Sequence, residues 1–175
     1  MLKGNKIVLR AMEPADASLL FKWENNSELW HISETLAPYS LHQLNYFIEQ
    51  SISQDIYSSR ELRLMISNND DIVLGIVDLF QFDPKNKRVG IGVLVHKDYR
   101  KQGIASESIA LIKDYCFTHL QLQQIWCTIS TQNIESISLF NKAGFEKSGL
   151  LKQWNINSCS NFEDVLILQC IKKTS

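Results

Sequence analysis

Hydrophobic and polar residues alternate or cluster along seven stretches of the chain and recur with helical spacing along four others. Alternation predicts strands, whereas apolar residues three and four positions apart predict amphipathic helices. The expected strands cover residues 6–10, 61–67, 72–82, 88–95, 124–130, 145–151 and 164–171. The expected helices cover residues 14–25, a segment that begins after Ser40, residues 106–119 and residues 133–142. The pattern therefore predicts an α/β protein with about seven strands and about four helices.

The connections between these segments predict how the strands pair. Polar turns at 68–71 and 83–86 are short enough to join antiparallel neighbours. The helix between strands 88–95 and 124–130 forms a crossover, and a crossover joins parallel strands. We therefore expect a mixed, mostly antiparallel sheet with one parallel pair. Because the 175-residue chain has no Pro/Gly/Ser-rich linker, it is expected to form a single domain over residues 1–175.

The turn between the strand at 88–95 and the following helix has the composition of an anion site. It reads Arg-Lys-Gln-Gly-Ile-Ala over residues 100–105 and continues into Ser106. Two cations and a glycine thus stand where a helix begins, and there the unpaired N–H groups and the helix dipole attract an anion. A diphosphate suits this place. Neither a Walker A loop nor a G-x-G-x-x-G pattern occurs, which disfavours a nucleoside triphosphate and a nicotinamide dinucleotide.

This strand, turn and helix resemble the central motif of the GNAT superfamily of acyl-CoA-dependent N-acyltransferases. Further motifs follow in the family's order: the segment 7–16, an Asn-x-x-Ser pattern at 133–136, and Phe-Asn-Lys-Ala-Gly-Phe at 140–145. The resemblance is to the spermidine/diamine and the ribosomal-protein N-terminal acetyltransferase branches. It implies an enzyme that moves an acetyl group from acetyl-CoA to a primary amine, by direct transfer in a ternary complex. The alternative is a non-catalytic acyl-CoA-binding or interaction domain on the same scaffold.

The resemblance also implies a set of cofactor-binding residues. The backbone of one strand would pair with the pantetheine amides, the turn would hold the pyrophosphate, and two positions of the later helix would contact the cofactor arm. An N–H near Leu94 would polarise the thioester carbonyl. These residues are Val93, Leu94, Val95, Arg100, Lys101, Gln102, Gly103, Ile104, Ala105, Ser106, Asn133 and Phe140. Asn133 is equally a plausible helix N-cap with Ser136 at N3, and residues 89–95 can also be read as a merely buried strand.

Two residues are candidates for the proton transfers. Relatives carry a Tyr where this chain has Phe140, which cannot protonate a leaving thiolate, and the resemblance makes Ser136 the candidate acid instead. Water, or no acid at all, is the alternative, because a thiol of pKa about 8.5 leaves tolerably well unaided. Asp78 is the candidate base if it faces the centre of the sheet. His31 and His42 are weaker candidates for the same role.

The acceptor site is expected in the segment from residue 25 to 46, by resemblance to the polyamine enzymes. Its candidate substrate-binding residues are Glu28, Trp30, His31, Glu34 and Tyr39. A polycation requires several carboxylates. Few lie nearby, and Gly90 replaces a family carboxylate. The acceptor, a small-molecule amine such as a polyamine or a peptide N-terminus, therefore stays open. Asn155 replaces a second family carboxylate, one that belongs to the ribosomal-protein branch.

Composition excludes some alternatives. The chain carries 18 basic and 19 acidic residues, which disfavours nucleic acid as a partner. It has no apolar stretch approaching 18 residues and no signal peptide, so we expect no membrane association and a cytoplasmic location. Its 4 cysteines lack metal-binding spacing and are expected to be reduced, and no metal is expected. Edge strands leave homo-oligomerisation open.

Overall fold

The computed structural model of the protein describes all residues except 28–29, 31–34, 158 and 174–175. Its described residues form a sheet of eight strands in the order β1-β2-β3-β4-β5-β6-β8-β7. Only the β5–β6 pair of this sheet is parallel. The strands are β1 (Leu2–Lys3), β2 (Val8–Ala11), β3 (Leu62–Ser67), β4 (Val73–Asp83), β5 (Arg88–Val95), β6 (Gln124–Ser130), β7 (Glu146–Ile156) and β8 (Phe162–Ile171). The mixed, mostly antiparallel sheet is thus confirmed.

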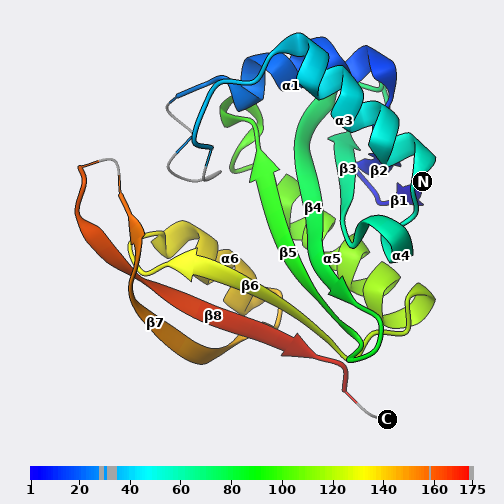
Figure 1. Cartoon of the computed structure of the whole chain (residues 1–175). Coiled ribbons are helices and arrows are strands. Elements are labelled where there is room, and N and C mark those ends of the chain that lie inside the picture. Colours follow the sequence, from blue (N-terminus) through cyan, green and yellow to red (C-terminus); the bar gives the residue numbers. More distant parts are fainter. Residues whose placement is uncertain (28–29, 31–34, 158, 174–175) are drawn as a thin grey trace.

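The helices cover both faces of this sheet. They are α1 (Ala17–Glu24), α3 (Leu41–Ser53), α4 (Ile56–Ser59), α5 (Ile104–Asp114) and α6 (Ile134–Lys142), with short 3-10 turns at Pro14–Asp16 and Lys97–Tyr99 and a π-helical turn at Tyr115–His119. Figure 1 shows α1 and α3 above the sheet and α5 and α6 behind it. Ser40 caps α3, which begins after it as expected: its side chain accepts from the Gln43 N–H, while the Gln43 side chain accepts from the Ser40 N–H.

The structure contains two short elements that were not expected, and some bounds differ from the expected ones. The short strand β1 was not expected, because two residues are too few for a visible alternation. The helix α4 was missed because four residues are too few to show helical spacing of apolar positions. β7 continues to Ile156, five residues beyond its expected end, and its pairing with β8 is irregular between Leu151 and Asn155. The irregularity breaks the period of two on which the expectation rested.

Two hydrophobic cores lie on opposite faces of the sheet. The larger is formed by the sheet with α5 and α6 and includes Ile91, Ile109, Ile125 and Phe140. The smaller lies under α1 and α3 and includes Leu20, Leu44, Met65 and Ile76. Side chains alternate between the two faces along a strand. The sheet therefore has a back face, packed on α5 and α6, and a front face that α1 and α3 share with polar residues.

The parallel strands β5 and β6 separate soon after they begin. Their register comprises only three pairs, the last of which is Gly90 with Trp126. β5 then continues to Val95 and β6 to Ser130 without further pairing to each other, and the two strands diverge in Figure 1. The separation leaves one backbone edge of β5 without a strand partner. The separation of these two strands could not be predicted from the sequence alone.

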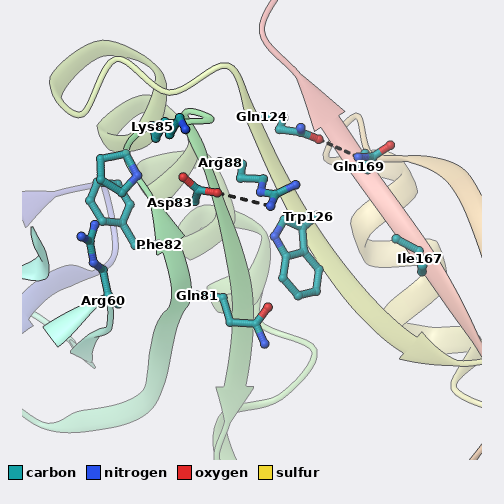
Figure 2. A pocket seen from close by; sticks show the side chains of 11 residues that line it. Arg60, Gln81, Phe82, Asp83, Lys85, Arg88, Gln124, Trp126, Ile167 and Gln169 are labelled. Carbon is teal, nitrogen blue, oxygen red and sulfur yellow. Dashed lines mark hydrogen bonds and ion pairs between the residues drawn. The ribbon is translucent and has the colours of Figure 1, made fainter.

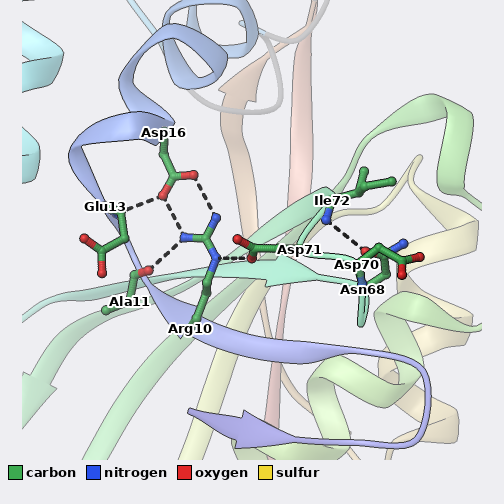
Figure 3. A network of polar contacts seen from close by, with 8 residues as sticks. All are labelled: Arg10, Ala11, Glu13, Asp16, Asn68, Asp70, Asp71 and Ile72. Atoms are coloured by element: carbon green, nitrogen blue, oxygen red, sulfur yellow. Dashed lines mark hydrogen bonds and ion pairs between the residues drawn. The ribbon is translucent and has the colours of Figure 1, made fainter.

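A buried ion pair fixes the chain between β2 and α1 (Figure 3). The Arg10 guanidinium donates to both oxygens of Asp16, at 2.8 and 2.9 Å, and to Asp71 at 3.0 Å. Asp16 also accepts from the Glu13 N–H, and its side chain is only 6% exposed. Burial alone would raise the pKa of Asp16, but these hydrogen bonds from Arg10 and Glu13 hold it below its ordinary value.

Asp16→Asn is expected to lower the free energy of unfolding by about 3 kcal/mol at neutral pH, because it leaves Arg10 without its main partner. The folded-state pKa of Asp16 lies below the unfolded value of 3.8, so its stabilising effect is present above that pH and is lost as the pH falls further. The deficit of the variant should shrink below pH 3.8. Urea unfolding at several pH values measures both effects. Asp71→Asn, at a partner that is 76% exposed, is the control and should cost less than about 1 kcal/mol.

Candidate active site

The helix α5 begins at a turn that leaves its N-terminal N–H groups without a side-chain cap. Gly103 is the N-cap residue, with φ +84°, and its carbonyl accepts the first helical bond from Glu107. Lys101 is also left-handed, with φ +62°. Because glycine has no side chain that could cap the helix, no side chain competes for the N–H groups of the first turn at the positive end of the helix dipole. The expected residues from Arg100 to Ser106 all lie at this helix start.

Contacts from two directions hold this turn in place. Arg100 donates from Nε to the Val95 carbonyl at 3.1 Å, which fixes the turn to the end of β5. On the other side, the Glu107 carboxylate accepts the N–H groups of Asn5 and Lys6. The Lys101 side chain is 84% exposed, and its 3.8 Å contact with Glu135 is too weak to restrain it. Arg100 is thus partly structural, whereas Lys101 remains available to an anion.

The backbone of β5 presents alternate residues to the open edge. The His96 N–H donates to the Leu74 carbonyl of the neighbouring chain segment, so even-numbered residues of β5 direct their backbone groups toward β4. Val93 and Val95 direct theirs the other way, into the space where β5 and β6 separate. Leu94 instead faces β4, and its side chain packs in the smaller core. The backbone groups of Val93 and Val95 thus face the open edge of β5, whereas those of Leu94 do not.

The start of α6 lies at the end of the loop that follows β6. Asn133 is its N-cap, and its side-chain oxygen accepts from the Ser136 N–H at 3.1 Å, so the expected capping is confirmed. Ser136 is half-buried in the first turn. Phe140 is 5% exposed, and its ring meets that of Phe145 edge-on at 5.0 Å. The Phe140 ring therefore packs as a core residue.

Asp78 does face the front of the sheet, but it is already ion-paired. Arg63 donates to both its oxygens, at 2.6 and 2.9 Å, and to Glu24 at 2.6 Å. Burial alone would lower the pKa of Arg63, but the charges of Asp78 and Glu24 raise it above its ordinary value. A base at Asp78 would have to break a bidentate ion pair to accept a proton. The cluster of Glu24, Arg63 and Asp78, with a formal charge of −1, joins α1, β3 and β4 and was not recognised in the sequence.

The point where β5 and β6 separate is closed by two aromatic rings. Phe80 packs edge-on against Trp126, with 5.2 Å between ring centroids. Gly90 lies under the Phe80 ring, where an added Cβ would come within 2.3 Å of a ring carbon. The glycine that replaces a family carboxylate is therefore required by packing. Gly92, two residues further along the same face, has room, since its nearest neighbours would be 3.9 Å away.

Gly90→Ala is expected to lower the free energy of unfolding by about 2 kcal/mol, because the methyl group forces the Phe80 ring off Trp126. Gly92→Ala makes the same chemical change on the same strand and face, and should cost less than about 1 kcal/mol. Urea unfolding of the two variants measures the difference. Equal losses would show that Phe80 does not pack over Gly90.

The expected acceptor residues are described only in part. Tyr39 is held by Asn25, whose side-chain amide donates to the Tyr39 carbonyl at 2.9 Å and accepts from its N–H at 2.8 Å. Trp30 donates from its ring nitrogen to the Glu24 carbonyl at 2.8 Å, which places it beside the Arg63 cluster. Glu28, His31 and Glu34 lie outside the described residues. His42 is exposed on α3.

A hollow of about 720 Å³ lies on the front face, at the end of β5 opposite the turn that leads into α5 (Figure 2). We call it the Trp126 hollow. The β4–β5 turn lines one side, and residues of β6 and β8 line the other. Its lining residues are Arg60, Gln81, Phe82, Asp83, Pro84, Lys85, Arg88, Gln124, Trp126, Ile167 and Gln169. None of them was singled out in the sequence as a binding residue, because they come together only through pairing of distant strands.

Comparison with known proteins places the chain in a family. Residues 6–146 match the model of the acetyltransferase (GNAT) domain. The chain is 28% identical over 150 residues to the uncharacterized N-acetyltransferase YokL of Bacillus subtilis, covering 86% of this chain and 81% of that protein. It is 25% identical over 162 residues to spermidine N(1)-acetyltransferase of Escherichia coli, covering 90% of this chain and 82% of that protein.

Solved structures share the fold. The spermidine N-acetyltransferase of Vibrio cholerae, in complex with CoA and spermine, superimposes with a TM-score of 0.84 at 21% identity, over 96% of both chains. Among the described residues, no helix is long and apolar enough to span a membrane. The family match covers most of the sheet and includes the turn from Arg100 to Ser106. The chain belongs to the acetyltransferase (GNAT) domain family, as its motifs indicated.

Proposed function

We propose that the protein is an acetyl-CoA-dependent N-acetyltransferase that transfers the acetyl group directly to a primary amine in a ternary complex. The carrying observation is that the uncapped start of α5 adjoins the open edge of β5, with Arg100 bonded to Val95 between them. A helix start suited to an anion thus lies directly beside a strand edge that is free to pair with a ligand. Residues 1–175 would act as one domain, which the continuous sheet from β1 to β7 supports.

The residues present fit coenzyme A. The N–H groups of Ile104, Ala105 and Ser106, with Lys101, would hold the diphosphate. Backbone groups of Val93 and Val95 would pair with the amides of the pantetheine arm, as a further strand would. Acetyl-CoA supplies an acyl thioester, which is activated toward an amine. The CoA complex of the Vibrio cholerae enzyme, with its matching fold, supports this choice.

The chain's own groups would orient the amine and handle its proton. The cluster of Glu24, Arg63 and Asp78 has a formal charge of −1 and lies on the front face, so it attracts an ammonium group. Because Arg63 occupies both Asp78 oxygens, a water held by the cluster is a better direct proton acceptor than Asp78 itself. Ser136, in the first turn of α6, remains the candidate donor to the departing thiolate.

The second candidate function is a non-catalytic acyl-CoA-binding domain. It is favoured by Phe140, which packs in the core and has no proton to donate, and by the ion-paired state of Asp78. Both candidates require the same cofactor site. They differ in whether an amine is acetylated.

Thiol release from acetyl-CoA separates the two functions. Polyamines, small amines, amines with acidic groups and peptides with free N-termini are assayed in parallel. Saturable release with one class supports the enzyme and identifies its acceptor class. Coenzyme A binding without release from any class would favour the binding domain.

We also propose that the protein forms a homo-oligomer. The β7–β8 hairpin exposes large apolar side chains, with Trp154, Ile156 and Phe162 each more than half exposed. Water-exposed apolar groups of this size favour a partner surface. The Vibrio cholerae spermidine N-acetyltransferase has been solved as a dodecamer. Sedimentation of wild-type protein and of Trp154→Ser measures the assembly and its dependence on this hairpin.

A further inference from the structure

The Trp126 hollow carries an excess of positive charge. Three cations, Arg60, Lys85 and Arg88, line it with a single carboxylate, Asp83, which gives it a formal charge of +2. Asp83 is already satisfied, because it accepts from the Asn86 side chain at 2.7 Å and from the Asn86 N–H at 2.9 Å and pairs with Arg88 at 3.2 Å. These Asn86 hydrogen bonds, with Arg88, hold the pKa of Asp83 below its ordinary value, so it stays ionised. The hollow therefore favours an anion.

The other lining residues add an aromatic ring and polar amides beside these charges, which suits a ligand that has an apolar part next to its acidic group. Trp126 is held edge-on by Phe80, which fixes the orientation of the indole ring. Gln124 and Gln169 pair through their side-chain amides at 2.6 Å on the far side. Gln81 has φ +50° at an irregularity of the β4–β5 pairing, and Figure 2 shows it and Trp126 on the side of the hollow toward the C-terminal end of β5.

The hollow and the negatively charged Arg63 cluster lie on one face of the sheet. Asp78 and Phe80 are two residues apart on β4, so their side chains share a face. Phe80 lies over Gly90 and against Trp126, which lines the hollow. The front face thus runs from a cluster of formal charge −1, past two aromatic rings, to a hollow of formal charge +2. The separation point of β5 and β6 lies between them, at Gly90 and Trp126.

Resting on the proposed function, we propose that the acceptor is a primary amine that also carries an acidic group, a carboxylate or a phosphate. Its amine faces the Arg63 cluster, and its acidic group occupies the Trp126 hollow beside Arg88. An acceptor with charges of opposite sign at its two ends matches the charges of the face at both places. A polyamine places a second cation in a hollow that already has a positive excess, and is disfavoured.

A matched series of amines tests this assignment. Pentylamine, cadaverine, δ-aminovalerate and aminobutyl phosphate have similar lengths and differ in the group opposite the amine. We expect kcat/KM for the carboxylate or the phosphate to exceed that for pentylamine by at least about tenfold, and cadaverine to be the poorest acceptor. The two acidic compounds distinguish a carboxylate site from a phosphate site.

Substitution of Arg88 locates the effect. Arg88→Gln should lower kcat/KM for the preferred acidic amine by about tenfold, and Arg88→Glu, which brings the formal charge of the hollow to zero, should abolish the preference for δ-aminovalerate over cadaverine. Lys142→Gln removes the same charge from α6, behind the sheet, and should leave the order unchanged. Thermal melting of each variant confirms folding, and Arg88→Lys, which keeps the charge, should retain the preference.

The outcomes separate this inference from the proposed function. Release of thiol with every amine, but with cadaverine preferred or with no dependence on Arg88, overturns the acidic acceptor and leaves the acetyltransferase standing. Absence of release with all four amines and with the wider amine panel overturns both.

Discussion

Gly103→Val is expected to weaken coenzyme A binding by about 100-fold, which corresponds to about 3 kcal/mol. Gly103 has φ +84°, and among the described residues no atom lies within 4 Å of the Cβ position. The valine side chain therefore projects from the start of α5 into the space where the diphosphate is proposed to bind. A β-branched residue also resists this backbone conformation, and relaxation would turn the first N–H groups of α5 away from the anion. Titration calorimetry with coenzyme A measures the loss.

Gly144→Val provides the matched control. Gly144 has nearly the same conformation, with φ +86°, but it follows α6, and its added Cβ would meet only the flexible end of Lys113 at 3.4 Å. Both variants should lose stability through the same backbone strain, about 1–3 kcal/mol. Only the Gly103 variant should lose coenzyme A affinity. Equal affinities would mean that the start of α5 does not bind the cofactor.

Arg63→Met is expected to lower the free energy of unfolding by about 4 kcal/mol at neutral pH, the largest stability effect that the ion pairs predict. The substitution leaves Glu24 and Asp78, whose side chains are 14% and 31% exposed, without their shared cation. Two partly buried carboxylates then repel each other. Urea unfolding of the variant and of the wild-type protein at neutral pH measures the deficit.

Removing all three charges tests the cause. The triple variant Arg63→Met, Glu24→Gln, Asp78→Asn keeps side chains of similar size and has no unpaired carboxylate. It should recover at least half of the lost stability, because the penalty comes mainly from uncompensated charge. A triple variant as unstable as Arg63→Met would instead assign the loss to the packing of Arg63 on Phe47, whose ring centroid lies 5.4 Å from the guanidinium carbon.

Local sequence patterns predicted the parts of the site that are formed by neighbouring residues. The turn from Arg100 to Ser106 is continuous in the chain, so its cations, its glycine and the helix that follows could be read together. Asn133 and Ser136 stand three residues apart, the spacing of an N-cap with its N3 residue, and they make that contact. The crossover between β5 and β6 required a parallel pair, and the structure has one there.

Features that depend on strand register could not be predicted in this way. Asp78 was recognised as a candidate base, but its ion pair with Arg63 joins residues 15 positions apart and depends on the β3–β4 register. Leu94 was assigned to the cofactor edge by resemblance, whereas the direction of its backbone groups depends on the hydrogen bonds between β5 and β4. The Trp126 hollow combines residues of β4, β5, β6 and β8. The hydrophobic periodicity within one segment does not indicate contacts between residues of different strands.

Gly90 illustrates how one residue can have two explanations. In the sequence it was only the loss of a family carboxylate, which bore on acceptor choice. In the structure it lies under Phe80, and any side chain there would collide with the ring. The Phe80–Trp126 pair thus occupies the place next to the strand opening, and the front face at this point is aromatic. This change of surface is consistent with an acceptor other than a polycation.

The most direct test of the proposed cofactor site is a crystal structure of the wild-type protein with coenzyme A. We expect the diphosphate against the N–H groups of Ile104, Ala105 and Ser106, and the pantetheine arm between β5 and β6, bonded to the backbone of Val93 or Val95. The Trp126 hollow should remain free for the acceptor. Coenzyme A bound in that hollow, or anywhere away from the start of α5, would contradict the account.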